Sequence, residues 1–177
     1  GEHDRALSVV RRWLGVEPDS ALAAHMAASL GGGPPPPRAP DGYVREEFDR
    51  FAADFDQQLQ HLGYRAPDLV LAEVEREFGS EARGLDVLDA GCGTGLCGSG
   101  LRGRAGRLVG VDLSPEMLKR ASGRGVYDEL VEAELTDYLN RSPAMFDLIV
   151  AVDTLNYFGV LESVFRAAYR ALRRGGR

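Results

Sequence analysis

The spacing of apolar residues along the chain changes near residue 85. Over 4–30 and again over 43–78, apolar side chains recur every three or four residues, which is the spacing of amphipathic helices. Short apolar runs of strand length follow, separated by helical stretches, at 85–90, 108–111, 130–133 and 146–152. Strands that alternate with helices pair in parallel through right-handed crossovers. The pattern therefore predicts an α/β domain preceded by a helical segment.

Residues 1–30 form the predicted helical segment. Apolar positions over 4–14 and 21–30 predict two short helices, with Pro18-Asp19-Ser20 as the turn between them. Such a pair resembles one tetratricopeptide unit, but a lone unit does not bury its own face and the sequence holds no second copy. The segment either ends a longer array or is a hairpin packed on the main domain, and the second interpretation is slightly favoured.

A linker is predicted at 31–40, where three glycines precede the proline run 34–37. The main domain then covers 41–177. It opens with a predicted helix over 43–62, whose stripe of aromatic and aliphatic side chains is typical of core packing. The sharper alternative is that this stripe forms a lid over a ligand site.

Composition and charge exclude several functions. The 177 residues carry a net charge of −6, and no basic block or stripe predicts a nucleic-acid partner. Cys92 and Cys97 make neither a disulfide scaffold nor, with the three histidines, a zinc site, so no metal is expected. No signal peptide or apolar run of membrane-spanning length is apparent. A soluble cytoplasmic protein is the default expectation.

The candidate chemistry lies where the strand at 85–90 runs into a turn with glycine at every second position, Gly91-Cys92-Gly93-Thr94-Gly95. Glycines permit positive φ and let a ligand approach the backbone. Acidic residues stand at the carboxyl ends of the four predicted strands, and parallel strands gather these ends at one edge of the sheet. These residues are Asp89, Asp112, Glu134 and Asp153.

Asp112 comes about twenty residues after the glycine turn, where it is placed to accept hydrogen bonds from two ribose hydroxyls. This arrangement fits both a nicotinamide dinucleotide and an adenosyl compound. Asp89, directly before the glycines, would repel a pyrophosphate but would attract an ammonium or sulfonium group. A cationic or zwitterionic adenosyl ligand is therefore favoured.

Three motifs carry a family resemblance: Asp89 to Gly95, Val111-Asp112-Leu113-Ser114 with Met117-Leu118, and Phe146-Asp147-Leu148-Ile149. Together with the closing Leu172-Arg173-Arg174-Gly175-Gly176-Arg177, they resemble the class I S-adenosylmethionine-dependent methyltransferases over 64–177. Residues 43–67 and the N-terminal segment resemble, more narrowly, bacterial methyltransferases with tetratricopeptide repeats. The resemblance implies a Rossmann-like sheet with strand order 3-2-1-4, followed in the family by further strands.

The resemblance also implies a cofactor, S-adenosylmethionine with S-adenosylhomocysteine as product, and roles for individual residues. The methionine part and ribose would lie against Gly91, Cys92, Gly93, Thr94 and Gly95. Asp89 would hold the amino group and Asp112 the ribose hydroxyls. The adenine would be bordered by Leu113, Met117, Glu134 and Leu135. The methyl group would lie near Asp153, Thr154 and Asn156. The pocket would be closed by Tyr43, Tyr64 and Arg65, although packing explains the two tyrosines at least as well.

The predicted activity is methyl transfer to a small-molecule acceptor. Because a sulfonium methyl is already activated, transfer depends on positioning and desolvation, so the residues do not reveal which atom is methylated. Asp153 and Tyr157 are the candidate proton acceptors. The first alternative is a cofactor-binding or scaffold module without catalysis, and the second is a NAD-dependent oxidoreductase.

The sequence ends at Gly175-Gly176-Arg177, where a fifth strand begins in the family. We therefore expect the strand at 146–152 to be an uncovered apolar edge. Either this edge or the N-terminal helices would bind a protein partner or a second copy. A domain shortened in this way is expected to bind its cofactor yet turn over poorly.

Overall fold

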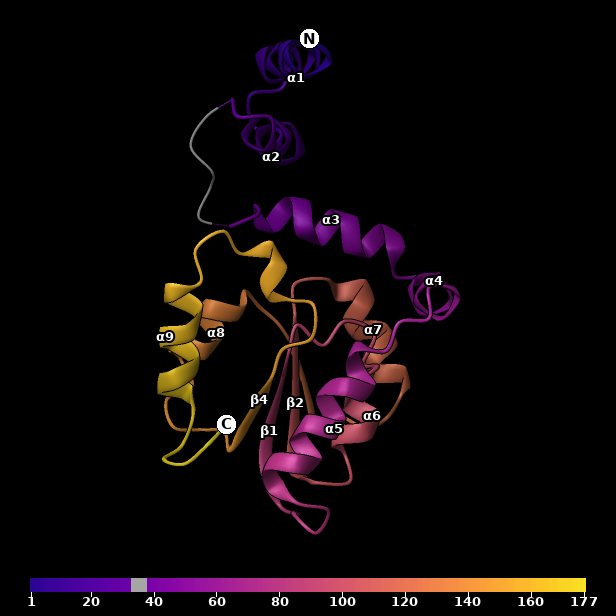
Figure 1. The fold of residues 1–177 in the computed structure, drawn as a ribbon, viewed down its shortest axis with the longest axis vertical. Coiled ribbons are helices and arrows are strands. Elements are labelled where there is room, and N and C mark those ends of the chain that lie inside the picture. Colours follow the sequence, from indigo (N-terminus) through magenta and orange to yellow (C-terminus); the bar gives the residue numbers. More distant parts are fainter. Residues whose placement is uncertain (33–37) are drawn as a thin grey trace.

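The computed structural model describes residues 1–32 and 38–177, so part of the linker predicted at 31–40 lies outside the described residues. Figure 1 shows a helical N-terminal part above a sheet that has helices on both faces. The two predicted N-terminal helices are confirmed as α1 (Glu2–Val16) and α2 (Ala21–Ser29). They share a small core of Val10, Ala23 and Ala27.

The sheet consists, within the described residues, of four parallel strands. They are β1 (Leu85–Ala90), β2 (Ala105–Asp112), β3 (Glu129–Glu132) and β4 (Leu148–Val150). Their order is β3-β2-β1-β4, which confirms the predicted α/β fold and strand order. Asp89 of the central β1 pairs in register with Gly110 of β2 and Val150 of β4. The carboxyl ends of the strands therefore reach one edge of the sheet.

Five helices pack along the sheet. They are α5 (Ala66–Phe78), α6 (Gly98–Leu101), α7 (Pro115–Gly123), α8 (Leu135–Asn140) and α9 (Glu162–Ala171). In Figure 1, α8 and α9 lie on one side of the sheet and α5 and α6 on the other. Across the described part of the chain, none of the helices is both long enough and apolar enough to cross a membrane.

The hydrophobic core is divided between the two faces of the sheet, as the alternation of side chains along β1 requires. Leu88 and Ala90 are buried on the face covered by α8 and α9, together with Phe146. Val87 is buried on the opposite face, against α5 and α6. By the same alternation, Asp89 belongs to the face of Val87, at the end of the strand.

Two short helices, α3 (Asp41–Phe51) and α4 (Phe55–His61), cross above the carboxyl ends of the strands (Figure 1). We call residues 41–61 the arm. The prediction of one helix over 43–62 is wrong, because the chain turns at 52–54. No glycine or proline causes this turn; instead α3 and α4 are bound to different partners, described below. Tertiary contacts thus override a continuous helical period.

Two local features were not predicted. Glu134 caps α8, since its Oε2 accepts a hydrogen bond from the N–H of Asp137 at 2.8 Å. A 3₁₀ turn over Leu155–Tyr157, which was not predicted, follows β4 and brings these residues back over the sheet edge.

The outer edge of β4 is not bare, so the expected uncovered edge is wrong in this respect. The N–H of Ile149 donates to the carbonyl of Arg177 at 2.8 Å, and the N–H of Arg177 donates to the carbonyl of Asp147 at 3.0 Å. Nearby, the N–H of Arg173 donates to the carbonyl of Phe146 at 2.8 Å. The backbone after α9 therefore pairs along the edge that β4 presents.

Candidate functional site

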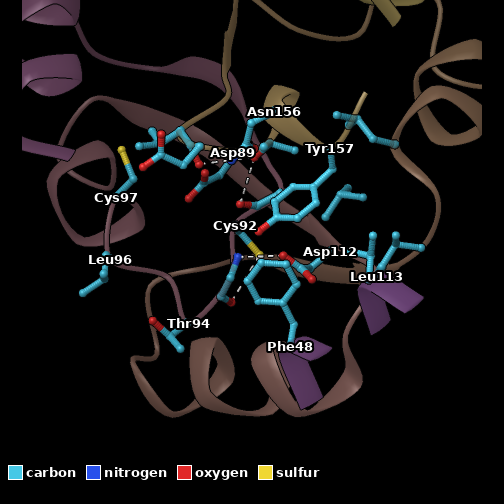
Figure 2. Close-up of a pocket in the computed structure, with 18 of the residues that line it drawn as sticks. Phe48, Asp89, Cys92, Thr94, Leu96, Cys97, Asp112, Leu113, Asn156 and Tyr157 are labelled. Atoms are coloured by element: carbon cyan, nitrogen blue, oxygen red, sulfur yellow. Dashed lines mark hydrogen bonds between the residues drawn. The ribbon is translucent and has the colours of Figure 1, made fainter. Parts of the chain in front are cut away.

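A cavity of about 340 Å³ lies between the carboxyl ends of the strands and the arm (Figure 2). Its floor is the glycine turn after β1 together with the residues that follow β2 and β4. Its roof is the apolar side of the arm, which contributes Val44, Phe48, Phe55 and Leu59. The lid alternative for the stripe on 43–62 thus matches where these side chains lie.

The glycine turn, Gly91 to Gly95, requires glycine for two different reasons. Gly91 has a φ of 72°, and a Cβ there would lie 2.2 Å from Oγ1 of Thr154, which itself donates to the carbonyl of Ala90. Gly93 has a φ of 53°, lines the cavity, and would place a Cβ in open space with no atom within 4 Å. The positive φ favours glycine at both positions, and close packing adds to this at Gly91, whereas Gly93 borders open space in the cavity.

Asp112 ends β2 opposite the glycine turn. Its carboxylate accepts hydrogen bonds from the N–H of Gly93 at 2.8 Å and from the N–H of Ser114 at 2.9 Å. Burial raises the pKa of Asp112, and these backbone hydrogen bonds oppose the rise without cancelling it. Each carboxylate oxygen still has capacity for a second donor. Asp112 is therefore held in direction by the backbone and can accept two further hydrogen bonds.

Asp89 is a buried carboxylate, 2% exposed, that also lines the cavity. Its Oδ2 accepts a hydrogen bond from the hydroxyl of Tyr127 at 2.7 Å. Burial raises the pKa of Asp89 to about 6, although the hydrogen bond from Tyr127 lowers it. At neutral pH the group is thus charged but poorly solvated, so a cationic ligand group beside it is favourable.

Polar contacts tie the arm to both sides of the glycine turn. Asp49 of α3 accepts a hydrogen bond from the hydroxyl of Ser114, at the start of α7, at 2.5 Å. Asp56 of α4 accepts one from the buried hydroxyl of Thr94 at 2.5 Å and pairs with Arg124. Thr94 of the floor, together with Ser114 and Arg124, therefore holds the roof in place.

A further contact crosses the cavity between Tyr64, which follows α4, and Asp153, which follows β4. The hydroxyl of Tyr64 donates to Oδ2 of Asp153 at 2.5 Å. Burial and this carboxylate raise the pKa of Tyr64, so the phenol remains a protonated donor. Asp153 has a φ of 53°, a left-handed conformation that aspartate tolerates better than most residues.

Most of the predicted site residues line this one cavity. They are Tyr64, Asp89, Gly91, Cys92, Gly93, Thr94, Asp112, Leu113, Glu134, Leu135, Asp153, Thr154, Asn156 and Tyr157. Figure 2 labels several of them, including Asp89, Asp112 and Tyr157, beside other residues that line the cavity. Glu134 faces the cavity while its Oε1 pairs with Arg38 at 2.8 Å, so its charge is already balanced.

Four predicted site residues do not line the cavity. Tyr43 stacks on the ring of His25 with centroids 4.9 Å apart. Met117 is fully buried inside α7, and Arg65 is exposed. Gly95 packs against Tyr127, which would lie 3.0 Å from a Cβ there. Tyr43, Met117 and Gly95 therefore pack around the cavity rather than on its surface, whereas Arg65 faces solvent.

The residues that sequence reasoning missed are those that hold the site together. Asp49 and Asp56 occupy polar positions of an amphipathic helix, which the pattern assigns to solvent. Tyr127 lies in the loop after α7. One local signal is Gly110 in the interior of β2, where a Cβ would lie 2.7 Å from Leu130, 2.9 Å from Cys92 and 3.0 Å from the Tyr127 ring, but it does not single out Tyr127. Glycine inside a strand often marks such a close approach.

The fold and the cavity define a class of proteins. A parallel sheet with a glycine turn after its central strand and a carboxylate after the next strand binds the nucleoside part of a cofactor. A family model described as "Methyltransferase domain" matches residues 87–176, which is 90 of the 177 residues. The chain therefore belongs to this family, within the class I S-adenosylmethionine-dependent methyltransferases. S-adenosylmethionine is the cofactor of the family.

Named relatives agree with this family. The chain is 36% identical to human Methyltransferase-like protein 27 over 111 residues, which is 62% of this chain and 45% of that protein. It is 30% identical to a Ubiquinone biosynthesis O-methyltransferase of Xylella fastidiosa (strain 9a5c) over 148 residues, which is 79% of this chain and 60% of that protein. The chain spans about half the length of the curated relatives it matches.

Solved structures show the same fold. One is a chain from the complex between the Haloferax volcanii Trm112 methyltransferase activator and a methyltransferase. It superimposes with a TM-score of 0.63 at 25% identity, and the match covers 75% of this chain and 57% of that chain. The order of strands and the helices on both faces are thus shared with known methyltransferase structures.

Proposed function

We propose that this chain binds S-adenosylmethionine in the cavity and transfers its methyl group to a small-molecule acceptor. The observation that carries the proposal is the juxtaposition of Gly93 and Asp112. Open space at the glycine adjoins a carboxylate that is fixed in direction by two N–H groups. The family of the chain and the O-methyltransferase among its relatives support this function.

The residues of the cavity fit the parts of this cofactor. Asp112 accepts the ribose hydroxyls, and Leu113 beside it offers apolar surface to the adenine. Asp89 attracts the ammonium group, because a buried carboxylate is stabilised by a neighbouring cation. S-adenosylmethionine supplies a methyl group on positively charged sulfur, which needs no further activation. The protein therefore contributes alignment and the exclusion of water, the second through the roof of the arm.

Calorimetric titration with S-adenosylhomocysteine tests the binding assignment through Asp112→Ala. Hydrogen bonds to a charged group contribute about 1.5–3 kcal/mol each, so the loss of two should weaken binding by roughly a hundredfold or more. Asp128→Ala is the matched control, because Asp128 also accepts a backbone N–H, from Leu108 at 2.7 Å, but lies outside the cavity. Unchanged affinity in Asp112→Ala would refute the ribose assignment.

Two further experiments distinguish the alternative functions. Titration with NAD tests the oxidoreductase, which Asp89 disfavours because its charge would face a pyrophosphate. Binding of NAD without binding of S-adenosylhomocysteine would overturn the proposal. Incubation with S-adenosylmethionine and a panel of acceptors, with mass spectrometry of the products, tests transfer. Tight cofactor binding without any methylated product would instead favour a cofactor-binding module.

A further inference from the structure

The side chains that line the cavity restrict which methyl acceptors fit it. Phe55 and Leu59 lie one helical turn apart on α4 and line the roof, and Tyr64 follows on the same segment. Phe55 packs edge-to-face on Phe48, with ring centroids 6.1 Å apart, and Phe48 packs in the same way on Tyr157 at 5.4 Å. These side chains offer an extended apolar and aromatic surface. They favour an acceptor with a flat apolar body.

The charges of the cavity are unfavourable for an acidic acceptor. Carboxylates contribute to the lining at Asp41, Asp89, Asp112, Glu134 and Asp153. Arg38 is the one cation among the lining residues that the structure describes. It is already engaged, because its Nη1 lies 2.9 Å from Asp41 and 2.8 Å from Glu134. A carboxylate or phosphate on the acceptor would lose water without gaining a free cationic partner.

Asp153 is the carboxylate best placed to meet the reacting group of an acceptor. Tyr64 holds its Oδ2, and the next residue, Thr154, is anchored to the carbonyl of Ala90 at 2.9 Å. Among the described residues, Oδ1 of Asp153 has no hydrogen-bond partner. The residue has a φ of 53°, so the contacts of its own side chain and of Thr154 coincide with an unusual backbone conformation. One oxygen is thus fixed and the other is available to accept an X–H group.

We propose that the acceptor is an uncharged phenol, whose hydroxyl donates to Oδ1 of Asp153 and whose ring packs against Phe55 and Leu59. This inference rests on the proposed methyl transfer. An O–H group on an aromatic ring is more acidic than that of an aliphatic alcohol, so it passes its proton to a carboxylate more readily as its oxygen bonds to the methyl carbon. In the reaction, the phenol oxygen bonds to the methyl carbon as the methyl–sulfur bond breaks. The electron pair stays on sulfur, and the proton passes to Asp153 and then to water.

The test is a comparison of two matched ligands, 2-naphthol and 6-hydroxy-2-naphthoate, titrated into the chain saturated with S-adenosylhomocysteine. They share a flat ring and a phenol and differ in one carboxylate. We expect 2-naphthol to bind at least roughly tenfold more tightly, because the carboxylate meets an acidic cavity. Equal binding, or preference for the naphthoate, would overturn the inference. Tighter binding of 2-naphthylamine than of 2-naphthol would overturn the phenol in favour of an amine.

Asp153→Asn supplies the decisive variant, because asparagine tolerates the same positive φ and has nearly the same shape. We expect the affinity for 2-naphthol to fall by roughly tenfold, since a charge-assisted hydrogen bond becomes a neutral one. The affinity for the naphthoate should stay constant or rise, since a repulsive charge is removed. Asp54→Asn, an exposed aspartate on the arm, is the control and should change neither affinity. If Asp153→Asn bound 2-naphthol as tightly as the wild type does, the assignment of Asp153 as the acceptor of the phenol hydrogen bond would be wrong.

The binding of S-adenosylhomocysteine distinguishes a failure of the proposed function from a failure of the proposed acceptor. It is measured first, on the wild-type chain and on each variant, and it also reports whether Asp153→Asn has folded. A wild-type chain that does not bind S-adenosylhomocysteine refutes the proposed function itself. A chain that binds S-adenosylhomocysteine but not 2-naphthol refutes only the acceptor.

Discussion

Replacement of Asp89 by asparagine should stabilise the fold and weaken cofactor binding at the same time. Asp89 is 2% exposed, and burial raises its pKa from an ordinary 3.8 to about 6. At about 1.4 kcal/mol per pH unit, this difference means that ionised Asp89 costs the folded state about 3 kcal/mol. An amide of the same shape carries no such cost. The carboxylate is therefore retained at the expense of stability, which is typical of a functional site.

The difference in the free energy of unfolding between Asp89→Asn and the wild type depends on pH. Because the pKa of Asp89 is higher in the folded chain than in the unfolded chain, the folded state binds the proton more tightly between about pH 4 and about pH 6. Its contribution to the free energy of unfolding therefore falls as the pH rises through this window and stays low above it. Asp89→Asn should match the wild type near pH 4 and exceed it by about 1–3 kcal/mol above about pH 7.

Urea unfolding across this pH range, together with titration of S-adenosylhomocysteine, measures both effects. We expect the variant to be more stable at neutral pH and to bind S-adenosylhomocysteine roughly tenfold or more weakly, through loss of the contact with the ammonium group. Tyr127→Phe is the opposite control, because it removes the hydrogen bond that supports the charged form and should lower stability at neutral pH. A less stable Asp89→Asn variant with wild-type affinity would refute the reasoning.

The remaining predictions concern the packing of the glycine turn and the contacts that bind the arm to it. Gly91→Ala should lower the free energy of unfolding by about 2 kcal/mol or more, because its Cβ would lie 2.2 Å from Thr154 at a φ of 72°. Gly103→Ala, with no atom near its Cβ, should be nearly neutral in the same urea experiment, and equal losses would contradict this explanation. Asp56→Asn weakens the hold of α4 on the turn, so S-adenosylhomocysteine should dissociate several-fold faster in stopped flow. Asp54→Asn on the same arm should leave that rate unchanged, and equal rates in both variants would argue against gating by the arm.

Elements whose signal is local were predictable from the sequence. Short apolar runs of strand length placed the strands, and a period near 3.6 placed the helices between them. The strand order 3-2-1-4 came from the resemblance of three motifs and is confirmed. The positions of Asp89 and Asp112 at neighbouring strand ends follow from the parallel pairing alone. For this reason most of the predicted site residues meet in one cavity.

Features that depend on distant partners were not predictable. Residues 43–62 carry an unbroken helical period, yet the chain turns at 52–54, because Asp49 and Asp56 are bound to residues far along the sequence. The local sequence pattern does not distinguish an aspartate that faces solvent from one that accepts a hydrogen bond from a distant hydroxyl. The same reason explains Tyr127, whose contact with Asp89 joins a loop to β1 across 38 positions of sequence.

The four acidic residues at the strand ends show how much such partners change the chemistry. The sequence predicts that the four acids gather at one edge of the sheet, and this negative charge favours a cationic ligand. In the structure each acid has a different partner: Arg38 balances Glu134, whereas Asp112 is fixed by N–H groups and the other two by tyrosine hydroxyls. Hydroxyl and amide donors direct a carboxylate without neutralising it. Asp89, Asp112 and Asp153 therefore line the cavity without a cationic partner among the described residues, whereas Glu134 is paired with Arg38 and also begins a helix.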